Sequence, residues 1–153
     1  MTSPKLRLAL AAGVFVAWIG YLTFLVATTR HPVILSRPQF LTAQLYVTAR
    51  LTGDADKPAA NITVEETLWA ANEKHNLPRG TELQVNLDDV GPEQGWDGEG
   101  VYVLPLRATA LPGTYFLPPV PRSPGFGGGK ARIYPATADA LQQVRDLIVE
   151  WKK

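Results

Sequence analysis

The densest group of side chains that could do chemistry is an acidic, glycine-rich stretch, DDVGPEQGWDGEG, at residues 88–100. Carboxylate oxygens are the ligands that hard cations such as Ca²⁺ prefer. The spacing differs from that of an EF-hand loop, where ligands alternate, Gly is sixth and Glu is twelfth. A solvated hairpin loop is therefore the favoured interpretation, and we predict no bound metal. If a cation did bind, the candidate ligands would be Asp88, Asp89, Asp97 and Glu99.

The other reactive residue types do not form a catalytic pattern. The chain has no cysteine, and its two histidines, His31 and His75, have no second ligand at metal-binding spacing. No serine lies in a Gly-x-Ser-x-Gly elbow. The run from Gly127 to Lys130 lacks the spacing of a phosphate-binding loop. We therefore predict no catalytic residue and no cofactor, and we favour a protein that is not an enzyme.

A proline-rich segment at residues 118–126, PPVPRSPGF, is a candidate partner-binding surface. Consecutive prolines hold an extended polyproline II shape, so binding would cost little ordering entropy. The alternative is that the prolines strap a loop across the domain while nearby aromatic side chains fill the core. The candidate partner-binding residues are Pro119, Pro121, Arg122, Phe126 and Trp96.

These candidates follow an apolar N-terminal segment. No charged residue lies between Arg7 and Arg30, and residues 8–28 read LALAAGVFVAWIGYLTFLVAT. A helix of this length spans roughly 32 Å at about 1.5 Å per residue, close to the roughly 30 Å hydrocarbon core of a bilayer. The sequence predicts a short tail at residues 1–7, a transmembrane anchor at 8–28 and a proline-containing spacer at 29–38. A cleaved signal peptide and a buried helix are the alternatives.

The orientation of this anchor depends on the charges at its two ends. Lys5 and Arg7 precede the segment, while Arg30 and Arg37 follow it, so the positive-inside rule nearly ties. A short N-terminus before a long C-terminal domain is typical of a signal anchor. We expect a single-pass protein with a cytoplasmic N-terminus and an extracytoplasmic C-terminal domain.

Period-two alternation predicts strands in residues 39–153. The clearest alternation runs from Leu41 to Leu51, and a second strand is expected from Asn61 to Trp69. Glu66 falls on the apolar face of that second strand, which a β-bulge near Glu65 and Glu66, an edge position or a buried functional carboxylate would explain. Further strands are expected at residues 83–87, 101–107 and 114–117, and a short extended piece at 131–134.

An amphipathic helix is predicted over residues 137–151. Thr137 is a suitable N-cap, and one apolar stripe appears at helical spacing: Leu141, Val144, Leu147, Ile148 and Trp151. We expect the stripe to cover an open side of the sheet, with a partner-binding helix as the alternative.

The predicted fold class is mainly β: a small five-stranded antiparallel barrel or rolled sheet, preceded by a transmembrane helix and followed by an amphipathic one. The order of features resembles the OB-fold barrels of some bacterial envelope proteins. The resemblance rests on the strand over residues 62–69, Gly80 before residues 83–85, and Gly100 before residues 101–106. It concerns about half of the chain and implies fold alone.

Anchor, spacer and small β domain together predict a membrane-anchored envelope protein that binds a partner or serves as an accessory subunit. The expected partners are the bilayer, through residues 8–28, and a membrane or envelope protein. A small metal-dependent hydrolase using residues 88–99, or an oligonucleotide-binding module, is the alternative. From Arg30 onward, thirteen Lys and Arg face fourteen Asp and Glu, and this near-neutral balance disfavours nucleic acid.

Overall fold

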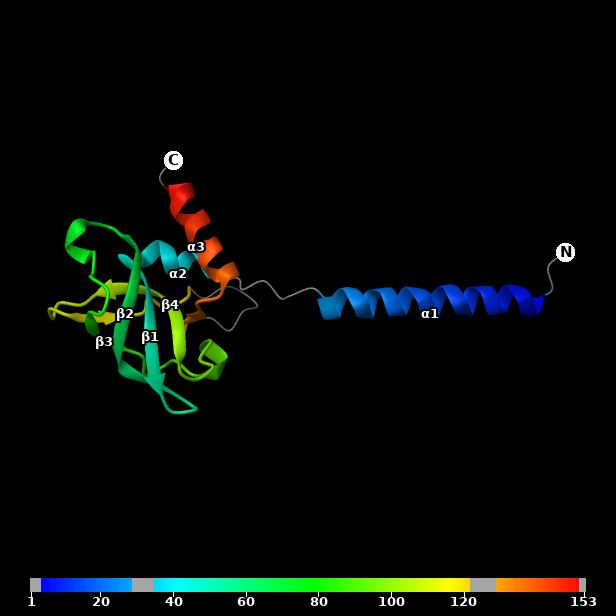
Figure 1. The fold of residues 1–153 in the computed structure, drawn as a ribbon, viewed down its shortest axis with the longest axis horizontal. Helices are drawn as coiled ribbons and strands as arrows, with labels where there is room; N and C mark the ends of the chain where they lie inside the picture. Colours follow the sequence, from blue (N-terminus) through cyan, green and yellow to red (C-terminus); the bar gives the residue numbers. More distant parts are fainter. Residues whose placement is uncertain (1–3, 29–34, 122–128, 152–153) are drawn as a thin grey trace. The chain divides into compact units, whose positions relative to one another are not determined.

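The computed structural model describes residues 4–28, 35–121 and 129–151. The chain forms two compact units, Met1–Pro32 and Val33–Lys153. Figure 1 shows the first as one long helix and the second as a barrel with attached helices. The second unit contains, in chain order, α2 (Arg37–Thr42), β1 (Leu45–Gly53), β2 (Pro58–Ala70), η1 (Glu73–His75), β3 (Glu82–Asn86), η2 (Pro92–Gln94), β4 (Gly100–Ala108), β5 (Thr114–Phe116), β6 (Tyr134–Pro135) and α3 (Ala138–Trp151).

The first unit is built around α1, which runs from Pro4 to Thr28 and confirms the predicted N-terminal helix. Its described side chains, residues 10–25, are all exposed within this unit. The Thr23 hydroxyl donates a hydrogen bond to the carbonyl of Ile19 at 2.8 Å, as expected for a threonine in an apolar helix. Among the residues that the structure describes, no helix was found that is both long and apolar enough to cross a bilayer.

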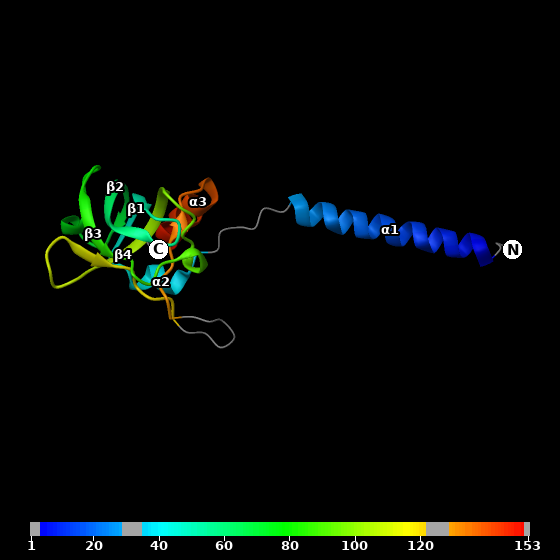
Figure 2. The same cartoon turned by 90° about the horizontal axis from the view of Figure 1, so that it is seen from below.

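Five strands of the second unit close into a small barrel in the order β1–β2–β3–β5–β4, with β4 pairing back to β1. In Figure 2, β3, β2, β1 and β4 follow one another around the barrel. The β3–β5 pair is parallel, and the other pairs in the ring are antiparallel. The predicted barrel is therefore confirmed, but the expectation of a purely antiparallel sheet was wrong. β6 adds a short antiparallel pairing outside the ring, on β4.

The first strand begins later than the alternation predicted. Residues 37–42 form the short helix α2, in which Pro38 occupies the first turn, where a missing N–H costs no hydrogen bond. Leu41 and Ala43 continued the period-two pattern by coincidence, and Leu41 is exposed on α2. β1 then starts at Leu45, after the turn that ends α2.

The conflict at Glu66 is resolved by a bulge, one of the solutions that the sequence suggested. Thr48 pairs with Glu66 and Ala49 pairs with Val64, so Glu65 is the extra residue on β2. A second irregularity leaves Leu68 unpaired between Thr67 and Trp69. The bulge lets Glu66 face solvent, and Glu66 is not a buried functional carboxylate.

The interior of the barrel is filled by apolar side chains that alternate along its strands, and we call it the inner cluster. On β1 these are Leu45, Val47, Ala49 and Leu51, as the alternation predicted. Side chains from β2, β3 and β4 complete the packing, among them Ile62, Val64, Val85, Leu104 and Leu106.

A second cluster, which we call the outer cluster, forms where α2 and α3 cover the barrel wall. Figure 1 shows these two helices together at one end of the barrel. Phe40, Tyr46, Val103, Tyr134, Val144 and Leu147 are buried in this cluster, and Leu141, Ile148 and Trp151 pack against it. The Thr137 hydroxyl oxygen accepts the Ala140 N–H at 3.2 Å. The predicted helix and its N-cap are therefore confirmed. Its apolar stripe packs on the outer wall of a closed barrel, however, and not on an open side of the sheet as expected.

Candidate functional site

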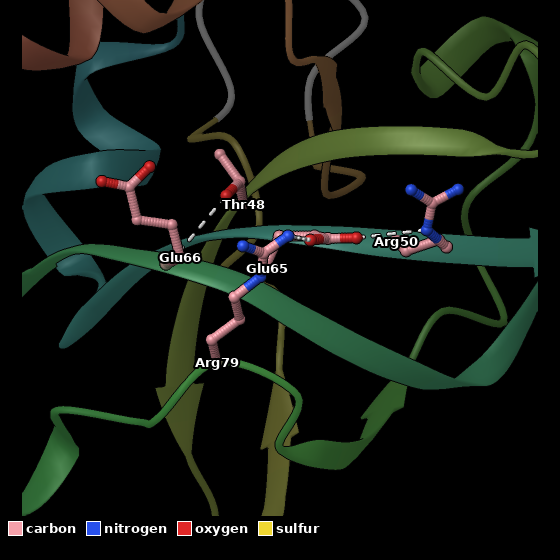
Figure 3. A network of polar contacts seen from close by, with 5 residues as sticks. All are labelled: Thr48, Arg50, Glu65, Glu66 and Arg79. Carbon is pink, nitrogen blue, oxygen red and sulfur yellow. Dashed lines mark hydrogen bonds and ion pairs between the residues drawn. The ribbon is translucent and has the colours of Figure 1, made fainter.

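The bulge in β2 creates a polar group on the outer surface of the barrel, drawn in Figure 3. Glu65 lies between two arginines, with Arg50 Nε donating to one carboxylate oxygen and Arg79 Nη2 to the other, both at 3.1 Å. Glu66 points away from this group, and its backbone oxygen accepts the hydroxyl of Thr48 at 3.5 Å. Two neighbouring carboxylates on one strand therefore have different surroundings.

In this group one carboxylate, that of Glu65, is paired with two guanidinium groups. Hydrogen bonds from Arg50 and then Arg79 hold the pKa of the Glu65 carboxyl below its ordinary value. The side chains of Arg50 and Arg79 are 60% and 81% exposed, so water screens both ion pairs. Both oxygens of the Glu65 carboxylate are engaged by guanidinium groups, so the contacts tie β1 and the loop before β3 to β2 and orient the two arginines.

The acidic residues named as candidate metal ligands lie in the loop between β3 and β4. Asp88, Asp89, Asp97 and Glu99 are all exposed. In the described part of the chain, no three His, Asp or Glu side chains converge into a group that could hold a metal ion. The geometry therefore gives the metal interpretation no support.

This loop is instead fixed by packing and backbone contacts. The Ile133 N–H donates to the carbonyl of Gln94 at 2.9 Å. At Gly95, φ is 101°, and a Cβ there would collide with the carbonyl oxygen of Ile133. The hydroxyl of Tyr102 accepts the Asp97 N–H at 3.0 Å and donates to the carbonyl of Gly98 at 2.8 Å. The glycines here serve close approach and a left-handed backbone.

Trp96, one of the candidate partner-binding residues, lies in the inner cluster. Its ring stacks on that of Tyr102 with centroids 5.5 Å apart, and its indole N–H donates to the carbonyl of Asp54 at 2.9 Å. It is buried, so it presents no surface to a partner, in agreement with the alternative that nearby aromatics fill the core.

The proline-rich segment leaves the barrel after β5. Leu117 and Pro118 are buried, whereas Pro119 and Pro121 are exposed. The Val120 N–H donates to the carbonyl of Lys130 at 3.3 Å, which joins the start of the segment to a residue beyond its end. Arg122 and Phe126 lie outside the described residues, as does His31. His75 lies on η1, partly exposed.

A buried polar network in the outer cluster was not predicted from the sequence. Gln39 is fully buried; its amide donates to the carbonyl of Arg132 at 2.9 Å and accepts the hydroxyl proton of Tyr134 at 2.9 Å. The Tyr134 oxygen in turn accepts the Ser36 N–H at 3.0 Å. Burial raises the pKa of the Tyr134 hydroxyl. Gln39 is a single polar residue between Pro38 and Phe40 and belongs to no periodic pattern, so the sequence held no signal for this network.

Two surface clefts lie among the described residues of the second unit. One, of about 190 Å³, lies between the start of the second unit and α3, lined by Leu35, Arg37, Gln143, Asp146 and Leu147. The other, of about 410 Å³, lies between the end of β2 and the turn around η1. Its lining is Thr67–Ala70 together with Asn72, Glu73 and Asn76.

No protein-family model matches the sequence, and the searches of curated proteins and of solved structures returned no match.

Proposed function

We propose that this protein is a membrane-anchored, non-enzymatic binding protein: α1 holds the barrel at a membrane, and the barrel engages a partner protein of the same membrane or envelope. The observation that carries the proposal is the surface of α1. Of the thirteen exposed large hydrophobic side chains among the described residues, ten belong to α1, with exposures from 38% to 69%. Apolar surface of this extent is unstable in water and requires an apolar environment.

The character of the segment favours lipid as that environment. The run from Leu8 to Thr28 carries no charge and is apolar on every helix face, whereas a helix covering a protein core needs only one apolar stripe. A helix satisfies all of its own backbone hydrogen bonds, as lipid demands. In this proposal the N-terminus is cytoplasmic and the barrel is extracytoplasmic.

The barrel contributes the binding function in this proposal. Its closed ring of five strands supports an OB-like assignment, a fold that many unrelated functions share. Pro119 and Pro121 are exposed, which supports a partner-binding surface at this segment. The proposed surface also includes Arg122 and Phe126. The near-neutral charge of the barrel argues for a protein partner over a nucleic acid.

The anchor is tested by alkaline extraction of membranes from cells expressing the full chain. The wild type and a matched variant, Phe15→Leu with Ile19→Leu, should stay in the pellet. Phe15→Lys with Ile19→Lys should move to the supernatant, since a lysine at the centre of a membrane helix costs about 2.5–3.5 kcal/mol. Release of the wild type by the alkaline wash would refute the anchor.

Orientation is tested with single cysteines, because the natural chain has none. In intact cells, a membrane-impermeant maleimide should label Glu99→Cys and leave Ser3→Cys unlabelled until the membrane is opened. The reverse pattern would place the barrel in the cytoplasm.

The partner is tested by purifying the tagged full chain in mild detergent. A stoichiometric protein should accompany the wild type and Pro112→Ala, which alters an exposed proline elsewhere. The same protein should be lost from Pro119→Ala with Pro121→Ala. Recovery of the wild type alone, as a monomer, would contradict partner binding.

A further inference from the structure

The larger of the two clefts carries an inference that goes beyond the proposed function and does not depend on the membrane anchor. We infer that the cleft between the end of β2 and the η1 turn binds a neutral sugar ring, through the indole of Trp69 and the amides of Asn72 and Asn76. Its volume of about 410 Å³ lies within the usual range of small-molecule sites.

One wall of the cleft is apolar and held in place. Leu68, Trp69 and Ala70 form it at the end of β2, where the second irregularity of that strand sets Leu68 out of the pairing. The ring of Trp69 lies 4.7 Å from that of Tyr46 and 5.8 Å from that of Trp151, measured between centroids. The indole is therefore positioned by the outer cluster before any ligand arrives, which lowers the cost of binding.

The opposite wall is polar, and its backbone is fixed. The Thr67 hydroxyl donates to the carbonyl of Leu77 at 3.0 Å and accepts the Leu77 N–H at 3.3 Å, which closes the turn across the strand. Within the turn, the His75 N–H donates to the carbonyl of Asn72, and the Asn76 N–H to that of Glu73, both at 3.1 Å. The backbone of the loop that holds the polar side chains is thus fixed by hydrogen bonds.

The side chains on that wall remain available for a ligand. Asn72, Glu73 and Asn76 are exposed, and their side chains make no hydrogen bond to any described residue. Each amide offers two donors and two lone pairs, and the carboxylate offers acceptors only. This mixture suits hydroxyl groups, which donate and accept at once.

Charge and shape select the ligand class. Glu73 is the only charged side chain that lines the cleft, so nothing there attracts an anion. One aromatic ring lines it, whereas recognition of quaternary ammonium groups uses a cage of several rings. A sugar ring has one face of weakly positive C–H bonds, which suits the negative face of an indole, and a rim of hydroxyls for the amides.

The test uses the full chain in a polyoxyethylene detergent, whose head group is neither sugar nor choline. Saturation-transfer NMR is recorded with cellotriose and chitotriose as probes, and with choline and triglycine as comparators. We expect saturable binding of at least one saccharide with a Kd of about 1 mM, strongest transfer to ring C–H protons, and no comparable transfer to choline or triglycine.

Variants decide whether the cleft is the site. Asn72→Ala and Asn76→Ala leave the packing untouched and should each weaken binding by about tenfold, because hydroxyl partners are lost. Trp69→Ala should abolish it. Asn61→Ala, an exposed amide on the same strand outside the cleft, should bind as the wild type does. Absence of saccharide binding, stronger binding of choline, equal binding of triglycine or full binding by both Asn72→Ala and Asn76→Ala would overturn the inference.

Discussion

The inner and outer clusters solve the problem of burying apolar surface in different ways. The inner cluster is largely aliphatic, drawn from strands that alternate side chains in and out of the barrel. The outer cluster is aromatic, with Phe40, Tyr46, Trp69, Tyr134 and Trp151 in mutual ring contact. It also contains the fully buried amide of Gln39.

The difference shows which kind of interaction specifies each cluster. Aliphatic side chains in a closed barrel need the right volume and little else, because the strands already fix their direction. The outer cluster joins helices to a barrel wall, where rings can slide, and directional hydrogen bonds fix the arrangement. Volume should therefore dominate the stability of the inner cluster, and polar geometry that of the outer one.

The largest effect is expected in the inner cluster. Leu104→Ala removes a fully buried side chain of β4 from the inner cluster and should lower the free energy of unfolding by roughly 2–5 kcal/mol. Urea denaturation of the full chain in detergent measures it. Leu111→Ala, in an exposed turn, is the matched control and should change stability by less than about 0.5 kcal/mol. A loss below about 1 kcal/mol at Leu104 would mean that the barrel interior collapses to fill the space.

The outer cluster gives the sharper test, because its key residue can be replaced at nearly constant volume. Gln39→Leu keeps the bulk but leaves the carbonyl of Arg132 without its donor, so stability should fall by roughly 1–3 kcal/mol. Gln142→Ala, an exposed amide on α3, is the control and should have little effect. If Gln39→Leu were as stable as the wild type, volume alone would govern both clusters and the comparison would fail.

The sequence predicted the strand that lines the inner cluster and the helix that covers the barrel, but not the contacts that build the outer cluster. Alternation identified Leu45 to Leu51 and so the barrel wall, and helical spacing identified α3 together with its N-cap, Thr137. Neither pattern reports which segments meet. The parallel β3–β5 pairing, the burial of Gln39 and the contact of Trp69 with Trp151 join parts of the chain that no local signal connects.

The same limit applies to the candidate sites. A count of carboxylates drew attention to residues 88–99, but the loop spreads them over the surface. Trp96 was a candidate partner-binding residue and is a core residue in the fold, as the alternative interpretation of the sequence held. The cleft beside Trp69 lies at the second irregularity of β2, where Leu68 is unpaired, and the sequence pattern gave no indication of it. Sites made by irregular backbone are thus the least visible from sequence.

A smaller effect on stability is expected at Tyr46. Its ring takes part in the packing of the outer cluster and its hydroxyl in the hydrogen bonding, so the two contributions can be tested separately. The hydroxyl donates to the carbonyl of Phe40 at 2.7 Å in a buried position. Tyr46→Phe keeps the ring contacts and should cost about 1 kcal/mol. Leu41→Ala, at an exposed position of α2, is the control.

Tyr46 also gives a dependence on pH. Desolvation by burial raises the pKa of its hydroxyl above the ordinary value of 10.0. The unfolded chain therefore loses this proton first, so stability should fall as pH rises above about 10. Tyr46→Phe should weaken that fall, leaving the part due to Tyr134, whose pKa burial also raises. An identical alkaline slope in both proteins would place the Tyr46 hydroxyl in contact with water.

The smallest effect is expected at Glu65, which lies outside both clusters and shows what an ion pair contributes when neither volume nor burial supports it. Arg50 and Arg79 are largely exposed, so Glu65→Gln should change stability at neutral pH far less than Gln39→Leu does. Because the two arginines lower the pKa of the Glu65 carboxyl in the folded state, its contribution is present above the ordinary value of 4.5 and is lost as pH falls through the folded pKa. The difference between wild type and Glu65→Gln should therefore vanish in acid and shrink at high salt. Urea denaturation across pH and salt measures this, with Glu66→Gln as the neighbouring control that breaks no ion pair. A loss at Glu65 as large as that at Gln39 would show that charge on the β2 bulge, and not the buried amide, holds the wall on which the outer cluster packs.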